Sequence, residues 1–136
     1  MEKKQPRDGR FLSINKMVAY VFDTTALLEQ VRRNTTYQLY TGAAIVTTKL
    51  NLFEVHYWLQ KDHGIETAKR FLESYYPFAK NINVKIIEEA VQVKQLHPKL
   101  SNTNCIGYAL SIQLKIPFLT NDRTFRSLTN AEYIAL

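Results

Sequence analysis

The chain has 136 residues, of which 46% are hydrophobic and 22% are charged, and its formal net charge is +6 at pH 7. This length corresponds to one folded domain, and this composition excludes an intrinsically disordered chain. No stretch approaches the roughly 18 consecutive apolar residues of a membrane-spanning helix, and the single cysteine cannot form an internal disulfide, so we expect a protein of the reducing cytoplasm.

The first 16 residues differ from the rest of the chain. They contain Pro6, Gly9 and five basic side chains against two acidic ones, and they lack apolar periodicity. We therefore predict a flexible basic arm over residues 1–16 and one folded domain over residues 17–136. A basic chain suits a polyanionic partner such as RNA, whose phosphates it neutralises, although many soluble proteins without such a partner are also basic.

From residue 17 onward, apolar runs typical of strands alternate with amphipathic helical patterns. In chain order, we predict a strand at 18–22, a helix at 25–33, a strand at 43–47, helices at 49–61 and 65–76, a weaker strand at 84–87, helices at 88–96 and 102–114, a strand at 117–120 and an edge strand at 132–136. This alternation predicts an α/β fold with a parallel sheet, and right-handed crossovers place helices on both of its faces.

Two aspartates follow predicted strands. Asp23 comes directly after the strand at 18–22, and Asp122 comes shortly after the strand at 117–120. Ligands of an open parallel sheet bind beyond the carboxyl ends of the strands, so both acids lie where such a fold forms its sites. Helix capping or turn formation is the alternative interpretation of either residue alone, because Asp favours both.

A third carboxylate, Glu54, lies in the helix predicted at 49–61. We expect the core-facing stripe of this helix to consist of its large apolar residues at helical spacing, which are Leu50, Phe53, Tyr57 and Trp58. Glu54 lies within that stripe, where an unpaired charge costs on the order of several kcal/mol. The stripe holds no basic residue, so either a Lys or Arg from elsewhere or a divalent cation shared with Asp23 and Asp122 has to compensate this charge.

Three carboxylates from separate segments favour a site for a hard cation. Carboxylate oxygens suit Mg²⁺ or Mn²⁺, and such an ion activates water for the hydrolysis of phosphodiester bonds. No Ser, Cys or His is needed as a nucleophile. The three histidines, His56, His63 and His97, stand apart and lack the spacing of a zinc site.

Four segments together resemble a known family. Residues 20–28 (YVFDTTALL), 49–59 (KLNLFEVHYWL), 100–110 (LSNTNCIGYAL) and 118–125 (FLTNDRTF) resemble, in order and spacing, the four motif regions of PIN-domain proteins, and the likeness is closest to VapC-type toxins of prokaryotic toxin–antitoxin pairs. The resemblance implies a three-layer α/β/α sandwich with a parallel four- or five-stranded sheet. It also implies RNA cleavage that depends on Mg²⁺ or Mn²⁺, a homodimer, and inhibition by a small antitoxin.

The resemblance also assigns residues by position. It implies that Asp23, Glu54 and Asp122 are acidic catalytic residues and metal ligands. It implies that Thr24 and Thr120 supply hydroxyls that orient metal-bound water.

At Asn104 the chain departs from the family pattern, which has an aspartate at this position. Asn has nearly the same shape as Asp and its amide oxygen can still bind a metal, so we keep Asn104 among the catalytic and metal-binding residues. Without a negative charge, however, it attracts a cation less strongly. The residue is compatible with a natural enzyme of weakened metal binding, with an inactive relative, or with an engineered attenuation, and an ordinary Asn early in a helix has the same local preference.

Further residues are candidates for contacts. Arg123 and Arg126, close to Asp122, are candidates to line the path of an RNA backbone. Tyr75, Tyr76 and Phe78 are aromatic residues that can form the core, a subunit contact or a stacking surface. Gly107 is expected to permit close packing of the helix at 102–114.

Two other functions compete with a ribonuclease. A PIN-like module that binds RNA or protein without cutting is the alternative that Asn104 keeps open. A phospho-acceptor receiver domain also gathers acids at strand ends, but the strand at 43–47 is followed by Thr48 and Lys49 rather than by an acceptor aspartate, which argues against it.

Overall fold

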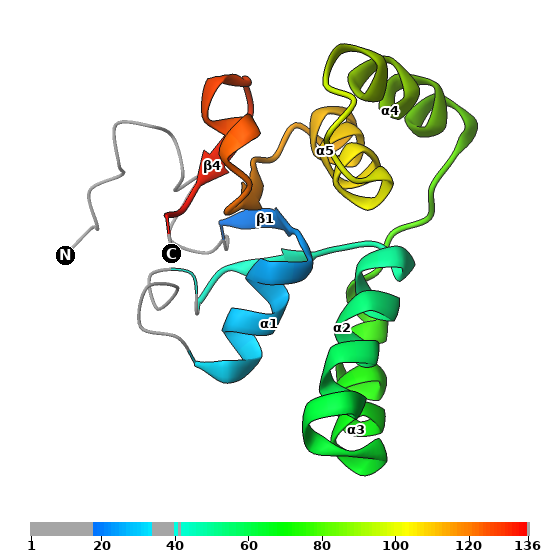
Figure 1. Cartoon of the computed structure of the whole chain (residues 1–136), viewed down its shortest axis with the longest axis vertical. Coiled ribbons are helices and arrows are strands. Elements are labelled where there is room, and N and C mark those ends of the chain that lie inside the picture. Colours follow the sequence, from blue (N-terminus) through cyan, green and yellow to red (C-terminus); the bar gives the residue numbers. More distant parts are fainter. Residues whose placement is uncertain (1–17, 34–39, 41, 136) are drawn as a thin grey trace, which may run out of the picture.

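The computed structural model describes residues 18–33, 40 and 42–135, and the arm predicted at residues 1–16 lies outside this part of the chain (Figure 1). Its elements in chain order are β1 (Ala19–Phe22), α1 (Thr24–Arg32), β2 (Ala44–Val46), α2 (Lys49–His63), α3 (Ile65–Tyr75), η2 (Tyr76–Phe78), α4 (Val84–Leu96), α5 (Asn102–Leu114), β3 (Phe118–Thr120), η3 (Arg123–Ser127) and β4 (Ala131–Tyr133). None of the described helices combines the length and apolar content that a membrane crossing requires.

The four strands form one parallel sheet in the order β2-β1-β3-β4, which confirms the predicted fold class. Val21 in β1 pairs with Val46 of β2 on one side and with Phe118 of β3 on the other. The chain thus passes from β1 to β2 on one side and later returns to β3 on the opposite side. Ligands of open α/β sheets bind at the carboxyl ends of the strands where the strand order reverses in this way. The rim beyond β1 and β3 is therefore the position at which this topology forms a site.

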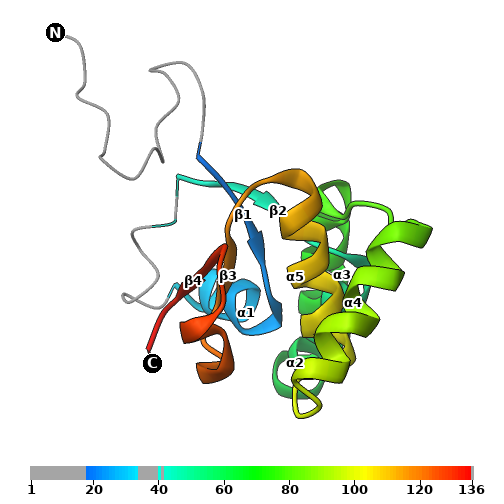
Figure 2. The same ribbon diagram turned by 90° about the horizontal axis from the view of Figure 1, so that it is seen from above.

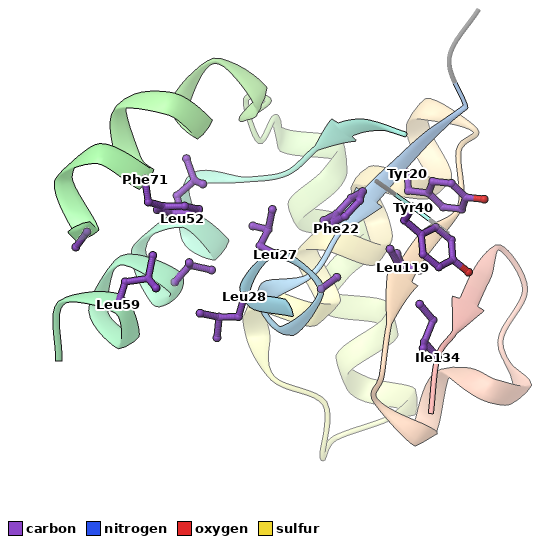
Figure 3. Close-up of a cluster of buried hydrophobic side chains, with 13 residues drawn as sticks. Tyr20, Phe22, Leu27, Leu28, Tyr40, Leu52, Leu59, Phe71, Leu119 and Ile134 are labelled. Atoms are coloured by element: carbon purple, nitrogen blue, oxygen red, sulfur yellow. The ribbon is translucent and has the colours of Figure 1, made fainter. Parts of the chain in front are cut away.

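Alternate side chains of β1 face two apolar layers, as the two-residue period of a strand requires. Tyr20 and Phe22 pack with α1, α2 and α3 in one buried cluster, which Figure 3 shows in close-up. Val21 points to the other face and packs with α4 and α5. Figures 1 and 2 show α1 and α5 on opposite sides of the sheet. Each fully buried large apolar side chain contributes about 1.5–3 kcal/mol, so both layers stabilise the strands between them.

The strand predicted at 84–87 is wrong, because these residues form the first turn of α4. Asn83 begins this helix: its side-chain oxygen accepts a hydrogen bond from the backbone N–H of Ile86 at 2.9 Å. A short β-branched apolar run fits a strand and a helix equally well, and the capping residue decides between them here. The sheet consequently has four strands within the described chain, and the predicted edge strand is present as β4.

The predicted core-facing stripe of α2 is also wrong. The buried face consists of Asn51, Leu52, Val55 and Leu59, whereas the four large apolar residues that were expected inside, Leu50, Phe53, Tyr57 and Trp58, are exposed. Two apolar stripes of helical spacing run along this helix, so periodicity alone does not distinguish the face that packs against α1 and α3. Glu54 is half-buried at the edge between the two faces.

Gly107 allows α5 to approach the sheet closely, as the sequence predicts. A Cβ atom at this position would lie 2.8 Å from Cε1 of Phe118 in β3. The ring of Phe118 is fully buried and is held between the rings of Tyr108 and Phe125. It therefore cannot move aside, and the contact between α5 and β3 requires glycine.

We predict that Gly107→Ala destabilises the fold. Overpacking against Phe118 costs about 1–3 kcal/mol, which exceeds the gain of at most about 1 kcal/mol in helix propensity. Urea denaturation measures the difference. Gly42→Ala is the control, since a Cβ atom there meets nothing within 4 Å and its stability should stay near that of the parent. A Gly107→Ala protein more stable than the parent would contradict the packing described above.

Candidate metal-binding active site

A polar cleft of about 350 Å³ opens at the carboxyl ends of β1 and β3, where α1 and α5 begin. Its lining residues are Asp23, Thr24, Thr25, Glu54, Ser101, Asn104, Asn121 and Asp122. All four residues that the sequence predicts as metal ligands, and the predicted Thr24, therefore lie around one cleft. The amino-terminal ends of α1 and α5 both meet it, and their unpaired N–H groups favour negative charge.

Asp23 is the most enclosed acid of the cleft, with 2% of its surface exposed. It begins α1, because its carboxylate accepts a hydrogen bond from the backbone N–H of Ala26 at 2.7 Å. The pKa of Asp23 is raised from its ordinary value of 3.8 to about 6, mainly because the carboxylate is buried; the charge of Asp122 adds to the rise, while hydrogen bonds from Thr120, Ala26 and Asn121 oppose it. The capping role and the position in the cleft thus belong to the same side chain.

Asp122 makes three hydrogen bonds, one of them to another residue that lines the cleft. Its backbone N–H donates to the hydroxyl of Thr120 at 3.0 Å, and that hydroxyl also hydrogen-bonds to the Asp23 carboxylate. The Asp122 carboxylate accepts from the backbone N–H of Thr124 at 3.0 Å and from the side-chain amide of Asn104 at 3.4 Å. Thr120 therefore links the two aspartates, and Asn104 places a neutral donor beside Asp122.

Glu54 is held by hydroxyl groups from two different helices. Its Oε1 accepts a hydrogen bond from Thr24 of α1 at 2.5 Å, and its Oε2 accepts one from Thr103 of α5 at 3.0 Å. Neither contact supplies a positive charge. The sequence predicts Glu54 in the site on the assumption that it is buried in the core stripe of α2, but it reaches the cleft from the edge of that helix.

The oxygen atoms that line the cleft are of the chemical type that binds a hard divalent cation. In residues 18–33 and 42–135, no Lys or Arg forms an ion pair with Asp23, Glu54 or Asp122. The buried carboxylate of Asp23 thus has no protein counter-charge within these residues. In the same residues, no three His, Cys, Asp or Glu side chains gather closely enough to hold a metal on their own. A partial set of carboxylates completed by water is the usual environment of Mg²⁺ in proteins.

The two predicted RNA-binding arginines lie outside the residues that line the cleft. Both belong to η3, which follows Asp122 directly, and both are exposed. The guanidinium of Arg126 lies over the ring of Tyr133 in β4, 5.8 Å from its centre.

A second, larger depression is apolar. It has a volume of about 570 Å³ and is lined by residues of α2, α3 and η2, namely Lys49, Leu52, Phe53, His56, Tyr57, Gln60, Lys61, Leu72 and Tyr76. We call this depression the α2–α3 groove. Its lining includes two lysines and no acidic residue, and Lys49 lies 5.4 Å from the centre of the Tyr76 ring. Of the predicted aromatic group, Tyr75 stacks on Phe71 in the core, whereas Tyr76 and Phe78 are exposed.

Sequence reasoning missed three residues that line the cleft and one that contacts Glu54. Ser101 and Asn121 line it, as does Thr25 beside the predicted Thr24, and Thr103 hydrogen-bonds to Glu54. Ser101 carries a usable signal, because a serine before a helical pattern marks an N-cap, and its hydroxyl does accept from the N–H of Asn104 at 3.0 Å. The contact of Thr103 with Glu54 joins residues 49 positions apart and has no signal in the local sequence.

Comparisons with known proteins agree with the fold. The sequence profile of the PIN domain matches residues 20–130. A toxin–antitoxin complex from Klebsiella pneumoniae contains a chain similar to this one, with a TM-score of 0.68 and 19% identity over 83% of this chain and 95% of that chain. VapBC2 from Rickettsia felis, bound to a DNA fragment from its promoter, gives a TM-score of 0.63 and 15% identity over 85% and 98% of the two chains. No curated protein sequence matches.

We predict that Asp23→Asn stabilises the metal-free protein at neutral pH. Because the pKa of Asp23 is raised from 3.8 to about 6 in the folded state, the folded protein binds this proton more tightly than the unfolded chain, and stability is lost as the pH rises from about 4 to above 6. At about 1.4 kcal/mol for each unit of pKa, that rise corresponds to about 3 kcal/mol at pH 7.5. Asn keeps the cap on α1 and has no charge to bury.

Urea denaturation in the presence of a chelator, at pH 4 and pH 7.5, measures this effect. The gain of the Asn variant over the parent should be large at pH 7.5 and small at pH 4. An equal difference at both values would contradict the assignment of the raised pKa to Asp23.

Proposed function

The chain belongs to the PIN-domain family, and on that premise we propose that it is a divalent-metal-dependent endoribonuclease that hydrolyses RNA phosphodiester bonds, acting as the toxin of a toxin–antitoxin pair. The observation that carries this proposal is the enclosed carboxylate of Asp23, which lies in one cleft with Asp122 and Glu54 and has no basic partner in the described chain. A buried negative charge of this kind is stabilised by a cation.

In this proposal, the carboxylates of Asp23, Glu54 and Asp122 and the amide oxygen of Asn104 hold Mg²⁺ or Mn²⁺. The chemistry supplied at the site when such an ion is bound is the activation of water for attack on phosphorus and the neutralisation of charge on the departing oxygen. Thr120 hydrogen-bonds to the carboxylate of Asp23 and to the backbone N–H of Asp122, and Thr24 donates to Glu54; both hydroxyls help to keep these acidic residues in place. This work of positioning is what the fold contributes to the reaction.

Arg123 and Arg126 are proposed to contact RNA phosphates on the side of the cleft formed by η3. Both side chains are exposed beside Asp122, and the chain as a whole is basic, with a net charge of +6. Arg123 is the stronger candidate, because Arg126 already rests on the ring of Tyr133. A guanidinium forms paired hydrogen bonds with phosphate oxygens.

We predict that Asn104→Asp raises RNA cleavage with Mg²⁺ or Mn²⁺ by tenfold or more, which corresponds to about 1.4 kcal/mol of the activation barrier. The reason is that a fourth carboxylate beside Asp122 strengthens the attraction for the cation. Cleavage of a panel of fluorescent RNAs measures the rates. A chelator should abolish cleavage, and Asp122→Asn in the Asn104→Asp background should remove the gain.

The same variant also distinguishes the alternative of a binding module that does not cut. If Asn104→Asp remains inert with both metals on all RNAs while it still binds them, the binding module is the better description. Loss of the hydrogen bond from Asn104 to Asp122 should in addition lower the metal-free stability of the variant, so a fall in stability with no gain in cleavage is a recognisable outcome.

A small antitoxin is the partner that we propose, and the α2–α3 groove is its docking surface. One of the two similar structures is a toxin–antitoxin complex, and the other is VapBC2 bound to a DNA fragment from its promoter. The groove offers exposed aromatic rings, including Phe53 and Tyr57, and carries Lys49 and Lys61 without any acidic lining residue. An amphipathic segment with acidic and apolar residues complements it in both respects.

We predict that Phe53→Glu releases this partner from the natively purified complex. Phe53 is 73% exposed, so the substitution is expected to leave the fold intact while it places a charge in the groove. Native mass spectrometry measures the complex, and Val84→Glu is the matched control, because Val84 is 72% exposed on α4, outside the groove. Equal loss from both variants, or from neither, would contradict docking in the groove. The same spectra report whether the chain is a homodimer, as its family resemblance predicts.

A further inference from the structure

A chain of side-chain hydrogen bonds connects the beginning of α2 to Glu54. The hydroxyl of Thr48 donates to Oδ1 of Asn51 at 2.7 Å, and Nδ2 of Asn51 donates to the hydroxyl of Thr24 at 3.1 Å. The hydroxyl of Thr24 donates in turn to Oε1 of Glu54 at 2.5 Å, and Thr103 donates to the other carboxylate oxygen at 3.0 Å. Thr48 and Asn51 are almost fully buried, with 0% and 1% of their surface exposed.

The direction of these hydrogen bonds is fixed by the number of available protons. Thr48 accepts from the backbone N–H of Asn51 at 3.2 Å, so its own proton is free for the Asn51 carbonyl oxygen. The amide group of Asn51 then faces Thr24 and can only donate. The single proton of the Thr24 hydroxyl is consequently left for Glu54. If the Asn51 amide were turned round, its oxygen would face Thr24 and compete for that proton. The Thr24 hydroxyl oxygen and Oε1 of Glu54 would then be 2.5 Å apart without a hydrogen between them.

Capping of α2 does not explain the side chain of Asn51. The cap on this helix is the contact between the Thr48 hydroxyl and the backbone N–H of Asn51, which any residue except proline at position 51 provides. Burying an amide side chain in place of an apolar one has a cost unless its hydrogen bonds are made. Those bonds connect it to Thr48 on one side and to Thr24, and through Thr24 to Glu54, on the other.

We propose, resting on the metal-dependent function above, that Asn51 is a positioning residue of the active site: it orients the Thr24 hydroxyl so that Glu54 is held in one conformation, with one oxygen accepting a hydrogen bond from Thr24 and the other from Thr103. Glu54 is half-buried and has a long, flexible side chain, so a fixed position lowers the entropy cost of holding a cation. Asn51 is not among the residues that line the cleft, and in this proposal it acts through Thr24.

The test is a double-mutant cycle of Asn51→Ala and Thr24→Val, made both in the parent and in Asn104→Asp. The dissociation constant of Mn²⁺ is measured from the electron paramagnetic resonance signal of the free ion, and kcat and KM are measured on one RNA. Loss of an outer hydrogen-bond partner of a metal ligand typically weakens metal binding about 10–100-fold, and we expect each single variant to weaken Mn²⁺ binding about tenfold and to lower kcat with little change in KM. In the Thr24→Val background, Asn51→Ala should have no further effect.

Two controls separate positioning from folding. Thr24→Ser keeps the hydroxyl that Thr24→Val removes, so its Mn²⁺ binding should be close to that of the parent. This comparison tests the role of the Thr24 hydroxyl even if Asn51→Ala does not fold. Ser111→Ala removes a buried hydroxyl that bonds to Tyr108 and Asn130 at the other end of α5; it should lower the urea midpoint and leave Mn²⁺ binding unchanged.

The possible results distinguish failure of the positioning role from failure of the proposed function. If Asn51→Ala lowers only the urea midpoint, or if its effect on Mn²⁺ binding adds fully to that of Thr24→Val, the positioning role is overturned while the proposed nuclease stands. If neither the parent nor Asn104→Asp binds Mn²⁺, the proposed function fails, and the role of Asn51 fails with it.

Discussion

The carboxylate of Asp23 lies at the end of the central strand β1, almost fully buried and without a cationic partner in the described residues. The groups that contact it, the hydroxyl of Thr120 and the backbone N–H groups of Ala26 and Asn121, are all neutral donors. They lower the cost of the charge but do not cancel it, since the pKa stays raised. The start of α1, through the N–H of Ala26, and the turn after β3, through the N–H of Asn121, both donate hydrogen bonds to this carboxylate.

Glu54 links the two helical layers at the same rim. Its two oxygens accept hydrogen bonds from Thr24 of α1 and Thr103 of α5, and these helices pack on opposite faces of the sheet. The close contact of Gly107 with Phe118 fixes the depth of α5 against β3, and so fixes the position of Thr103 and Asn104 over the cleft. The packing of α5 against β3 therefore contributes both to the stability of the core and to the geometry of the site.

The sequence was sufficient for the features that depend on neighbouring residues. Strand runs followed by Asp23 and Asp122 predicted both the sheet and its rim, and these predictions are confirmed in the fold and in the lining of the cleft. Glu54 was predicted in the cleft for a wrong reason, because α2 has two apolar stripes and only tertiary packing selects the buried one. The strand predicted at 84–87 is a helix instead, because Asn83 caps α4 there. The contacts of Asn51 and Thr103 join residues 27 and 49 positions apart, and no local pattern encodes them.

The hydrogen bond from Asn104 to Asp122 has a consequence for how this cleft can change over generations. Codons for asparagine and aspartate differ by a single base transition. One such event converts the hydrogen bond from the amide of residue 104 to Asp122 into repulsion between two carboxylates, and this adds to the negative charge that a cation would have to compensate. The backbone does not have to rearrange for this exchange, because Asn and Asp have nearly the same shape.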